Sequence, residues 1–205
     1  MTDATRSAHP SAPTRALPDA DHGQAAHGST AVRRYHPLVV ALHWLAALLI
    51  VANLVTGFFA LHPLPNDADK LVPLRIHMTA GLLVLLFLVI RLPTRLLTAR
   101  PVIPHRSRGL RLLALSNHWG LYVVTLAMIS TGFGTAALTG ILPLLGGEAV
   151  TLPASFEAVP PFAGHELFAF VLAALVALHV SAVVYHRVAH RENILPRMWF
   201  GRRRG

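Results

Sequence analysis

Apolar residues in this chain gather in four long runs, separated by stretches that are polar or rich in proline and arginine. The runs cover approximately residues 38–61, 76–92, 112–138 and 163–186. Each is close to the ~20 residues that an α-helix needs to cross ~30 Å of hydrocarbon. Charged residues make up only 13% of the chain, which together with the long runs excludes a soluble globular protein. The pattern predicts an all-α membrane protein with a bundle of four transmembrane helices.

The basic residues indicate which helix ends share one side of the membrane. Arginines cluster just before the first run, between the second and third runs, and after the fourth. Only Lys70 and Arg75 lie between the first and second runs. By the positive-inside rule, both termini and the second connection are cytoplasmic. The net charge of +9 therefore belongs to the membrane ends. Because the basic clusters lack interleaved aromatic residues, this charge does not indicate nucleic-acid binding.

Composition divides the chain into a membrane domain with a tail at each end. Residues 1–32 are rich in Ala, Ser, Pro, Thr and His without an apolar run, so they cannot bury enough surface to fold. We predict a disordered cytoplasmic tail over 1–32, a four-helix membrane domain over 33–198 and a basic cytoplasmic tail over 199–205. The third connection, residues 139–162, is too apolar for a solvated linker and too irregular for another span. We expect it to cap the external ends of the helices.

The last apolar run holds two histidines, His165 and His179, which lie 14 residues apart. On an α-helix this spacing brings the second imidazole to within about 40° of the first, about 21 Å further along the axis. One face therefore presents two nitrogen ligands at two membrane depths. An ionisable side chain inside a bilayer is costly and marks a functional site by default, so both histidines need partners.

Two more histidines supply those partners. The first helix enters from the cytoplasm with His43 near its start, so His43 shares the cytoplasmic-side level with His179. The second helix enters from outside with His77 near its start, so His77 shares the external level with His165. Two donors per level are too few for a zinc site, which takes three or four, unless Glu166 takes part. The alternative, four unrelated polar residues, is disfavoured by their cost in lipid.

Haem iron fits this count, because the porphyrin supplies four ligands and the protein only two axial ones. The chain contains no cysteine, which excludes covalent haem attachment and thiolate-ligated iron–sulfur clusters. The favoured interpretation is two bis-histidine b haems stacked across the membrane.

Two glycines lie at the depth of the external pair. Gly57 follows His43 by 14 residues, and Gly132 follows His118 by the same interval. A glycine here lets a flat macrocycle approach the backbone, or equally lets two helices pack closely.

Four polar residues are weaker site candidates. Arg91 lies 14 residues after His77, where it could pair with a cofactor carboxylate or act as a membrane-end anchor. His118 is favoured as an interfacial polar residue over a ligand or quinone contact. Arg75, with Lys70, could draw an anionic reactant to the external pair or simply anchor the second helix. Arg34 belongs to a motif at the entry of the first helix.

Several short motifs surround the histidines. They are Arg34-Tyr35, Leu42-His43-Trp44, Ile76-His77 with Gly81, Arg91-Leu92, Gly132, Gly164-His165, Leu178-His179 and the closing stretch from Glu192 to Met198. From about Arg34 to Met198 the chain thereby resembles the bacterial cytochrome b561 family of four-helix dihaem membrane cytochromes. The resemblance implies two haem b groups with His43, His77, His165 and His179 as the iron ligands.

The resemblance also implies a place in the bacterial inner membrane and in electron transport of the respiratory-chain kind. Electrons would pass between ubiquinone or another quinone of the membrane pool and an external donor or acceptor. One branch of the family is associated with superoxide oxidation, which makes superoxide:ubiquinone oxidoreductase activity a candidate.

Two other functions stay open at this point. The chain could be a haem-bearing anchor and electron relay for a separate periplasmic oxidoreductase, or a four-helix transporter without haem. The long N-terminal tail and the proline- and glycine-rich third connection depart from the family pattern, so they leave the substrate and the partner open.

Overall fold

The computed structural model describes residues 35–98, 108–189, 191 and 194–199. Its long helices are α1 (Pro37–Val55), α2 (Ala68–Leu97), α3 (Arg108–Leu138) and α4 (Pro160–Ala189). All four spans, α1 together with its π-helical extension, are long and apolar enough to cross a membrane, and the described part contains no strand. This confirms the predicted all-α fold. The predicted tails, 1–32 and most of 199–205, lie outside the described residues, and the cytoplasmic location of the termini stays a prediction.

The observed helices extend beyond the apolar runs, most clearly at the start of α2. The side chain of Asp67 accepts a hydrogen bond of 3.0 Å from the backbone N–H of Asp69, which caps the first turn. α2 therefore begins at residues that are too polar for hydropathy to predict as membrane-spanning. The predicted start at Ile76 lies inside the helix. At the end of α1 the chain continues as a π-helical segment, η1 (Thr56–Leu61), which hydropathy did not predict.

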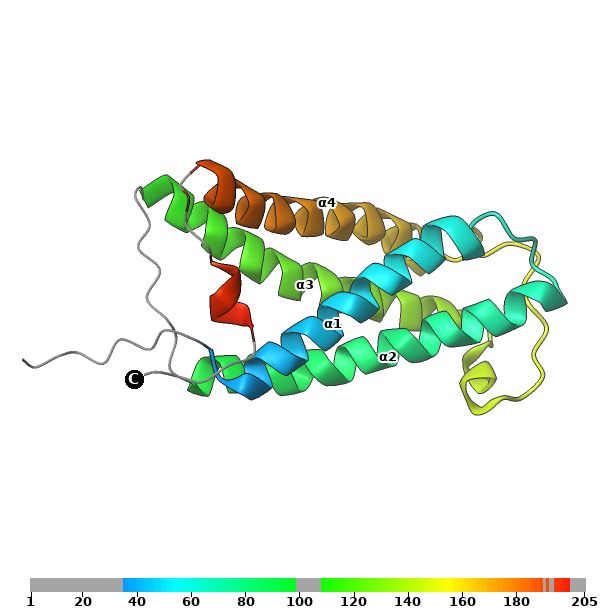
Figure 1. Ribbon diagram of the computed structural model, residues 1–205. Coiled ribbons are helices and arrows are strands. Elements are labelled where there is room, and N and C mark those ends of the chain that lie inside the picture. Colours follow the sequence, from blue (N-terminus) through cyan, green and yellow to red (C-terminus); the bar gives the residue numbers. More distant parts are fainter. Residues whose placement is uncertain (1–34, 99–107, 190, 192–193, 200–205) are drawn as a thin grey trace, which may run out of the picture. The chain divides into compact units, whose positions relative to one another are not determined.

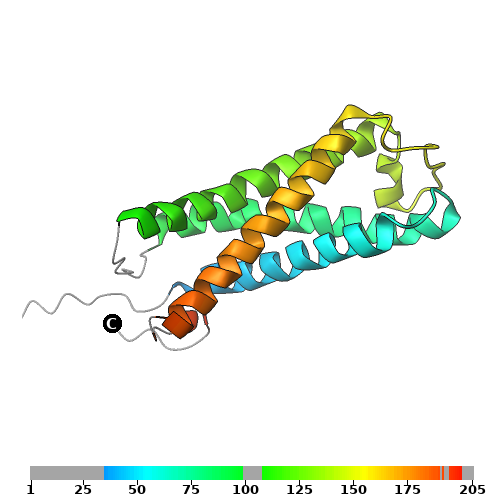
Figure 2. The ribbon, with the colours of Figure 1, turned by 90° about the horizontal axis from the view of Figure 1, so that it is seen from above.

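The helices pack in two close pairs, with α1 along α2 and α3 along α4 (Figure 1). Seen from above, α4 crosses the other helices obliquely (Figure 2). Leu54 of α1, Met128 of α3 and Leu172 of α4 meet in one buried apolar cluster. Because this cluster takes one side chain from α1 and two from the α3–α4 pair, it joins the two helix pairs.

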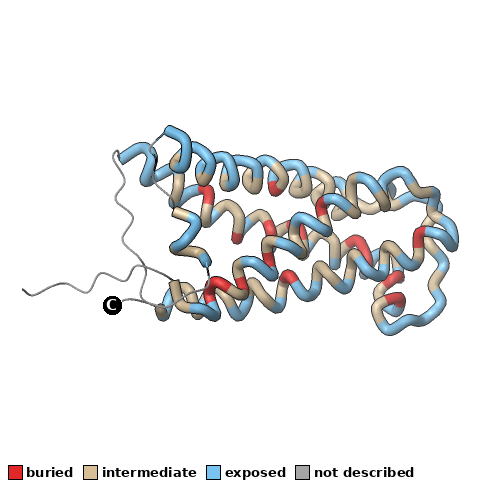
Figure 3. The backbone as a smooth tube through the Cα atoms, in the orientation of Figure 1, coloured by how far each residue is buried: buried red, intermediate tan, exposed pale blue. Residues whose placement is uncertain are grey.

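Many large apolar residues are exposed, and the buried positions are scattered along the inner faces of the helices (Figure 3). In a bilayer, lipid covers such an apolar surface. The threonine hydroxyl groups of α3 are satisfied within the helix. Those of Thr125, Thr131 and Thr135 donate to the carbonyl four residues earlier, at 2.6, 2.9 and 2.9 Å. These polar residues are therefore compatible with a membrane span.

The third connection packs onto the helix ends, in agreement with the expected capping role. It contains a short 3₁₀ helix, η2 (Leu142–Gly146), and buries Ile141 and Leu144, which are only 2% and 5% exposed. The side-chain amide of Asn66, in the first connection, donates to the carbonyl of Pro153 at 3.1 Å. The two connections at this end are thus joined.

The opposite end is closed by the last described residues. The backbone N–H of Tyr35 donates at 3.1 Å to the carbonyl of Arg197, which lies in the 3₁₀ helix η3 (Leu195–Met198). Trp44 donates its indole N–H to the carbonyl of Met198 at 2.8 Å, and its ring centre lies 5.8 Å from that of Trp199. This segment is therefore held against the first turns of α1.

Candidate cofactor site

The four histidines predicted to share two levels lie in two pairs. The ring centres of His43 and His179 are 6.2 Å apart, and those of His77 and His165 are also 6.2 Å apart. We call these the first pair (His43 and His179) and the second pair (His77 and His165). α4 contributes one histidine to each, so its 14-residue interval sets the distance between the pairs.

In the second pair, both Nδ1 atoms face oxygen acceptors. His165 Nδ1 lies 2.9 Å from the carbonyl of Met128, which can only accept. His77 Nδ1 lies 3.4 Å from the hydroxyl of Thr56, which itself donates to the carbonyl of Asn53 at 3.1 Å. Both rings are therefore oriented to carry their proton on Nδ1 and to present the lone pair of Nε2. This is the tautomer in which a histidine binds a metal through Nε2.

Glycines stand beside both rings of the second pair. A Cβ atom at Gly132 would lie 2.9 Å from Cε1 and 3.0 Å from Nδ1 of His165, closer than packing allows. A Cβ at Gly57 would lie 3.6 Å from Cε1 of His77, which is an ordinary contact. Gly132 is therefore required for the position of the His165 ring, whereas Gly57 has room for a methyl group.

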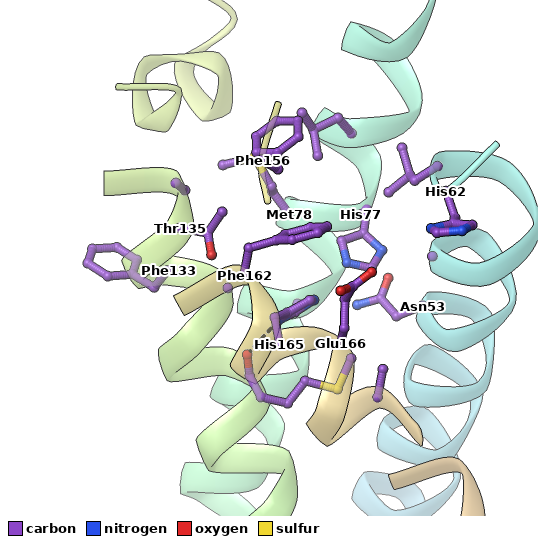
Figure 4. A pocket seen from close by; sticks show the side chains of 18 of the residues that line it. Asn53, His62, His77, Met78, Phe133, Thr135, Phe156, Phe162, His165 and Glu166 are labelled. Atoms are coloured by element: carbon purple, nitrogen blue, oxygen red, sulfur yellow. Dashed lines mark hydrogen bonds between the residues drawn. The ribbon is translucent and has the colours of Figure 1, made fainter. Parts of the chain in front are cut away.

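A cavity of about 770 Å³ adjoins the second pair. Its walls are mostly apolar and aromatic, with Met78, Phe156 and Phe162 among them, and Figure 4 shows these side chains around His77 and His165. This volume lies within the ~300–1,000 Å³ of ordinary ligand pockets. The cavity is large enough for a sizeable apolar cofactor whose polar contacts are few.

The first pair has charged surroundings. One guanidinium nitrogen of Arg91, Nη2, lies 3.0 Å from Nδ1 of His43, and Nη1 donates to the hydroxyl of Tyr122 at 2.8 Å. The guanidinium carbons of Arg91 and Arg95 lie 5.6 and 5.5 Å from the centre of the Tyr122 ring. Arg91 Nε is buried without a hydrogen-bond partner among the described residues. A buried donor of this kind could serve an acceptor on a bound group.

His118, expected at the interface, lies against the first pair. Its ring centre is 5.2 Å from that of His179, and its Nδ1 donates to the carbonyl of Ala114 at 2.6 Å. Within the described part of the chain, no group of three or more His, Cys, Asp or Glu could hold a metal ion. His118 therefore does not turn the first pair into a three-histidine metal site.

The two cations near the second pair differ in exposure. Lys70 is only 8% exposed, donates to the side chain of Asn66 at 2.7 Å and lies 5.9 Å from the ring centre of Phe156. Arg75 is exposed, with its guanidinium against Gly147 at the end of η2. Arg34, the remaining candidate, lies outside the described residues.

Sequence reasoning missed Tyr122 and Thr56, which contact Arg91 and His77 respectively. Tyr122 lies four residues after His118 and so on the same helix face, a signal that was available. Thr56 directly precedes Gly57, but its contact depends on the local π-helical geometry.

The chain is similar to known members of one protein family. The family described as prokaryotic cytochrome b561 matches residues 34–201. A curated relative, cytochrome b561 homolog 2 of Escherichia coli (strain K12), is 26% identical over 171 residues, which cover 80% of this chain and 90% of that protein. No solved structure matches significantly.

The family match spans all four helices and includes both histidine pairs. Membership implies b-type haem and electron transfer in a bacterial membrane. The chain belongs to the prokaryotic cytochrome b561 family, as a multi-pass membrane haemoprotein of electron transfer.

Proposed function

We propose that the chain binds two b haems, one at each histidine pair, and carries electrons across the membrane between the quinone pool and a reactant on the other side. The observation that supports this most directly is the equal separation of 6.2 Å between ring centres in the two pairs. Two imidazoles that shared one metal ion through their ring nitrogens would have ring centres about 6 Å apart, since each metal–nitrogen distance would be about 2 Å. Both pairs have their ring centres at this separation.

The surroundings of each pair also fit haem. At the second pair, three features favour haem: oxygen acceptors at both Nδ1 atoms, the room that Gly132 leaves for the His165 ring, and the mostly apolar cavity of about 770 Å³. At the first pair, it lies in the unpartnered Nε of Arg91, a donor for an anionic or carbonyl oxygen. When bound, each haem supplies a centre that takes up and releases one electron.

The helices set the distance between the two proposed haem sites and their depth in the membrane. His165 and His179 on α4 set the two centres about 21 Å apart along the helix, a large part of the ~30 Å hydrocarbon thickness. By the positive-inside rule the first pair is on the cytoplasmic side and the second on the external side. Mostly apolar and aromatic side chains line the cavity beside His77 and His165.

Superoxide is the candidate external reactant. Two superoxide anions would each give one electron and leave as dioxygen, while one quinone takes up two electrons and two protons to become quinol. The exposed Arg75 provides a cation near the second pair that would favour an anionic donor. In the alternative function, as an anchor and relay for an external oxidoreductase, the same electron path would be used with a protein as donor.

The experiment is a pyridine haemochrome assay on purified protein, combined with reduced-minus-oxidised spectra after adding superoxide or quinol. We expect two low-spin b haems per chain and reduction by at least one of the two reagents. One haem or none per chain would overturn the dihaem proposal. Two haems that superoxide does not reduce would favour the relay function over direct superoxide oxidation.

A further inference from the structure

We infer that Arg91 holds the first pair at a higher midpoint potential than the second, so that electrons move downhill from the second pair to the first. This inference rests on the proposed function, because it needs a haem at each pair. Each transfer oxidises the centre at the second pair by one electron and reduces the centre at the first pair by one.

The charges of the helix bundle are distributed unequally between the two pairs. The carboxylates of the described residues all belong to the end of the second pair: Asp67, Asp69, Glu148, Glu157 and Glu166. Glu157 and Glu166 line the cavity beside His77 and His165, and they offset the single cation of Lys70 in the same lining. The first pair has Arg91 in direct contact with His43, and Arg95 close by on the same tyrosine.

Such charges act on redox potential with a definite sign. The reduced centre carries one positive charge fewer than the oxidised centre, so a nearby cation favours reduction and a nearby carboxylate favours oxidation. Inside an apolar span this effect is screened little by salt. Arg91 and Arg95 therefore raise the potential at the first pair, whereas at the second pair Glu157 and Glu166 offset the cations Lys70 and Arg75.

The hydrogen bonds of the imidazoles act in the same direction. His165 and His77 face neutral oxygens of Met128 and Thr56 with Nδ1, which makes the rings stronger electron donors and stabilises oxidised iron. His43 faces a guanidinium instead. A guanidinium can only donate, so it cannot accept the Nδ1 proton of an iron-bound His43, and this ring does not gain the electron density that oxygen acceptors give His77 and His165.

Arg91 stays near the first pair even when its bond to His43 is lost. A neutral His43 that binds iron through Nε2 carries its proton on Nδ1 and can no longer accept from Arg91. The bond from Nη1 to the Tyr122 hydroxyl, 2.8 Å, does not depend on His43. Tyr122 thus retains the charge beside the centre, and the released Nη2 and the unpartnered Nε become available to another acceptor.

The test is a spectroelectrochemical titration of the haem-loaded protein in which Arg91→Gln is compared with Arg91→Lys. We expect two redox components, and we expect His43→Ala to remove the one with the higher midpoint potential. Arg91→Gln should lower the midpoint potential of that component and leave the midpoint potential of the other unchanged. Arg91→Lys keeps the charge and should remain near the wild-type potential. Haem content is measured on every sample by pyridine haemochrome.

Two results would overturn the inference. One is that His43→Ala removes the lower component, and the other is that Arg91→Gln retains two haems without a shift in the higher one. If Arg91→Gln does not assemble, Arg95→Gln takes its place in the test. It should lower the midpoint potential of the higher component by a smaller amount, and no shift would overturn the inference. A wild-type protein with fewer than two haems would instead contradict the proposed function, so the two failures are distinguishable.

Discussion

The first and second histidine pairs share α4 and the same ring separation of 6.2 Å, yet their surroundings differ. The second pair adjoins a cavity and has oxygen acceptors at both Nδ1 atoms. The first pair is in contact with Arg91 and lies close to His118. Repetition along one helix can therefore give two sites of the same ligand geometry, while the neighbouring helices give each site its own charge.

The largest expected effect comes from removing a ligand. His43→Ala and His179→Ala should each lower the haem content from two per chain to one by loss of the same haem, since each removes one of the two side chains that would hold that haem. His77→Ala and His165→Ala should remove the other haem. Redox titration of the correctly folded fraction of each variant identifies the missing component. If His43→Ala and His77→Ala removed the same component, the two-level arrangement would be wrong.

A glycine substitution should affect only one of the two pairs, and its effect should be smaller than that of removing a ligand. Gly132→Ala places a methyl carbon 2.9 Å from the His165 ring, so the ring must move. Overpacking of this kind costs about 1–3 kcal/mol, and the loss should fall on the haem of the second pair alone. Gly57→Ala is the matched control, because its methyl group would lie 3.6 Å from His77. Haem content and thermal unfolding measure both variants, and equal effects would contradict the role assigned to Gly132.

These two predictions rest on features that differ in how well the sequence alone indicates them. The number of helices follows from apolar runs near the membrane thickness, and the proximity of the histidines within each pair follows from depth and helix direction. Both depend on position along the helix axis. The sequence therefore predicted that His43 lies at the level of His179 and His77 at the level of His165, whereas the binding of haem by each pair stays a prediction.

The contacts of Arg91 could not be derived in this way. Its depth was predicted from the 14-residue interval after His77, but its bonds to His43 and Tyr122 join residues 48 and 31 positions apart. Such contacts depend on which helices are neighbours and how each is rotated, and hydropathy does not specify either. The contact of Thr56 with His77 was missed for a related reason, because the π-helical segment changes the direction of side chains locally.

A single hydroxyl should have a smaller effect than Gly132. Thr56→Val keeps the shape of the side chain but removes the acceptor facing His77 Nδ1. A hydrogen bond of this kind contributes about 1 kcal/mol, and at 3.4 Å we expect less. The potential of the second pair should rise slightly, because the His77 ring becomes a weaker electron donor. Thr56→Ser keeps the hydroxyl and is the control; an equal shift in both variants would point to packing instead.

The smallest expected effect concerns the approach of an anionic reactant to the second pair. Arg75 is exposed, whereas Lys70 is buried and bonded to Asn66, so only Arg75 presents its charge to solvent. Arg75→Gln should slow reduction by superoxide or dithionite by about twofold at low salt, and the difference should fade as ionic strength rises.

Lys70→Gln is the control. It should leave the salt dependence of the reduction rate unchanged and instead lower thermal stability, because the buried bond to Asn66 is weakened. Stopped-flow reduction rates at several salt concentrations separate the two variants. If Arg75→Gln left the rate and its salt dependence unchanged, Arg75 would act only as an anchor of α2 against η2, and the attraction of anions to the second pair would have to come from elsewhere on this face.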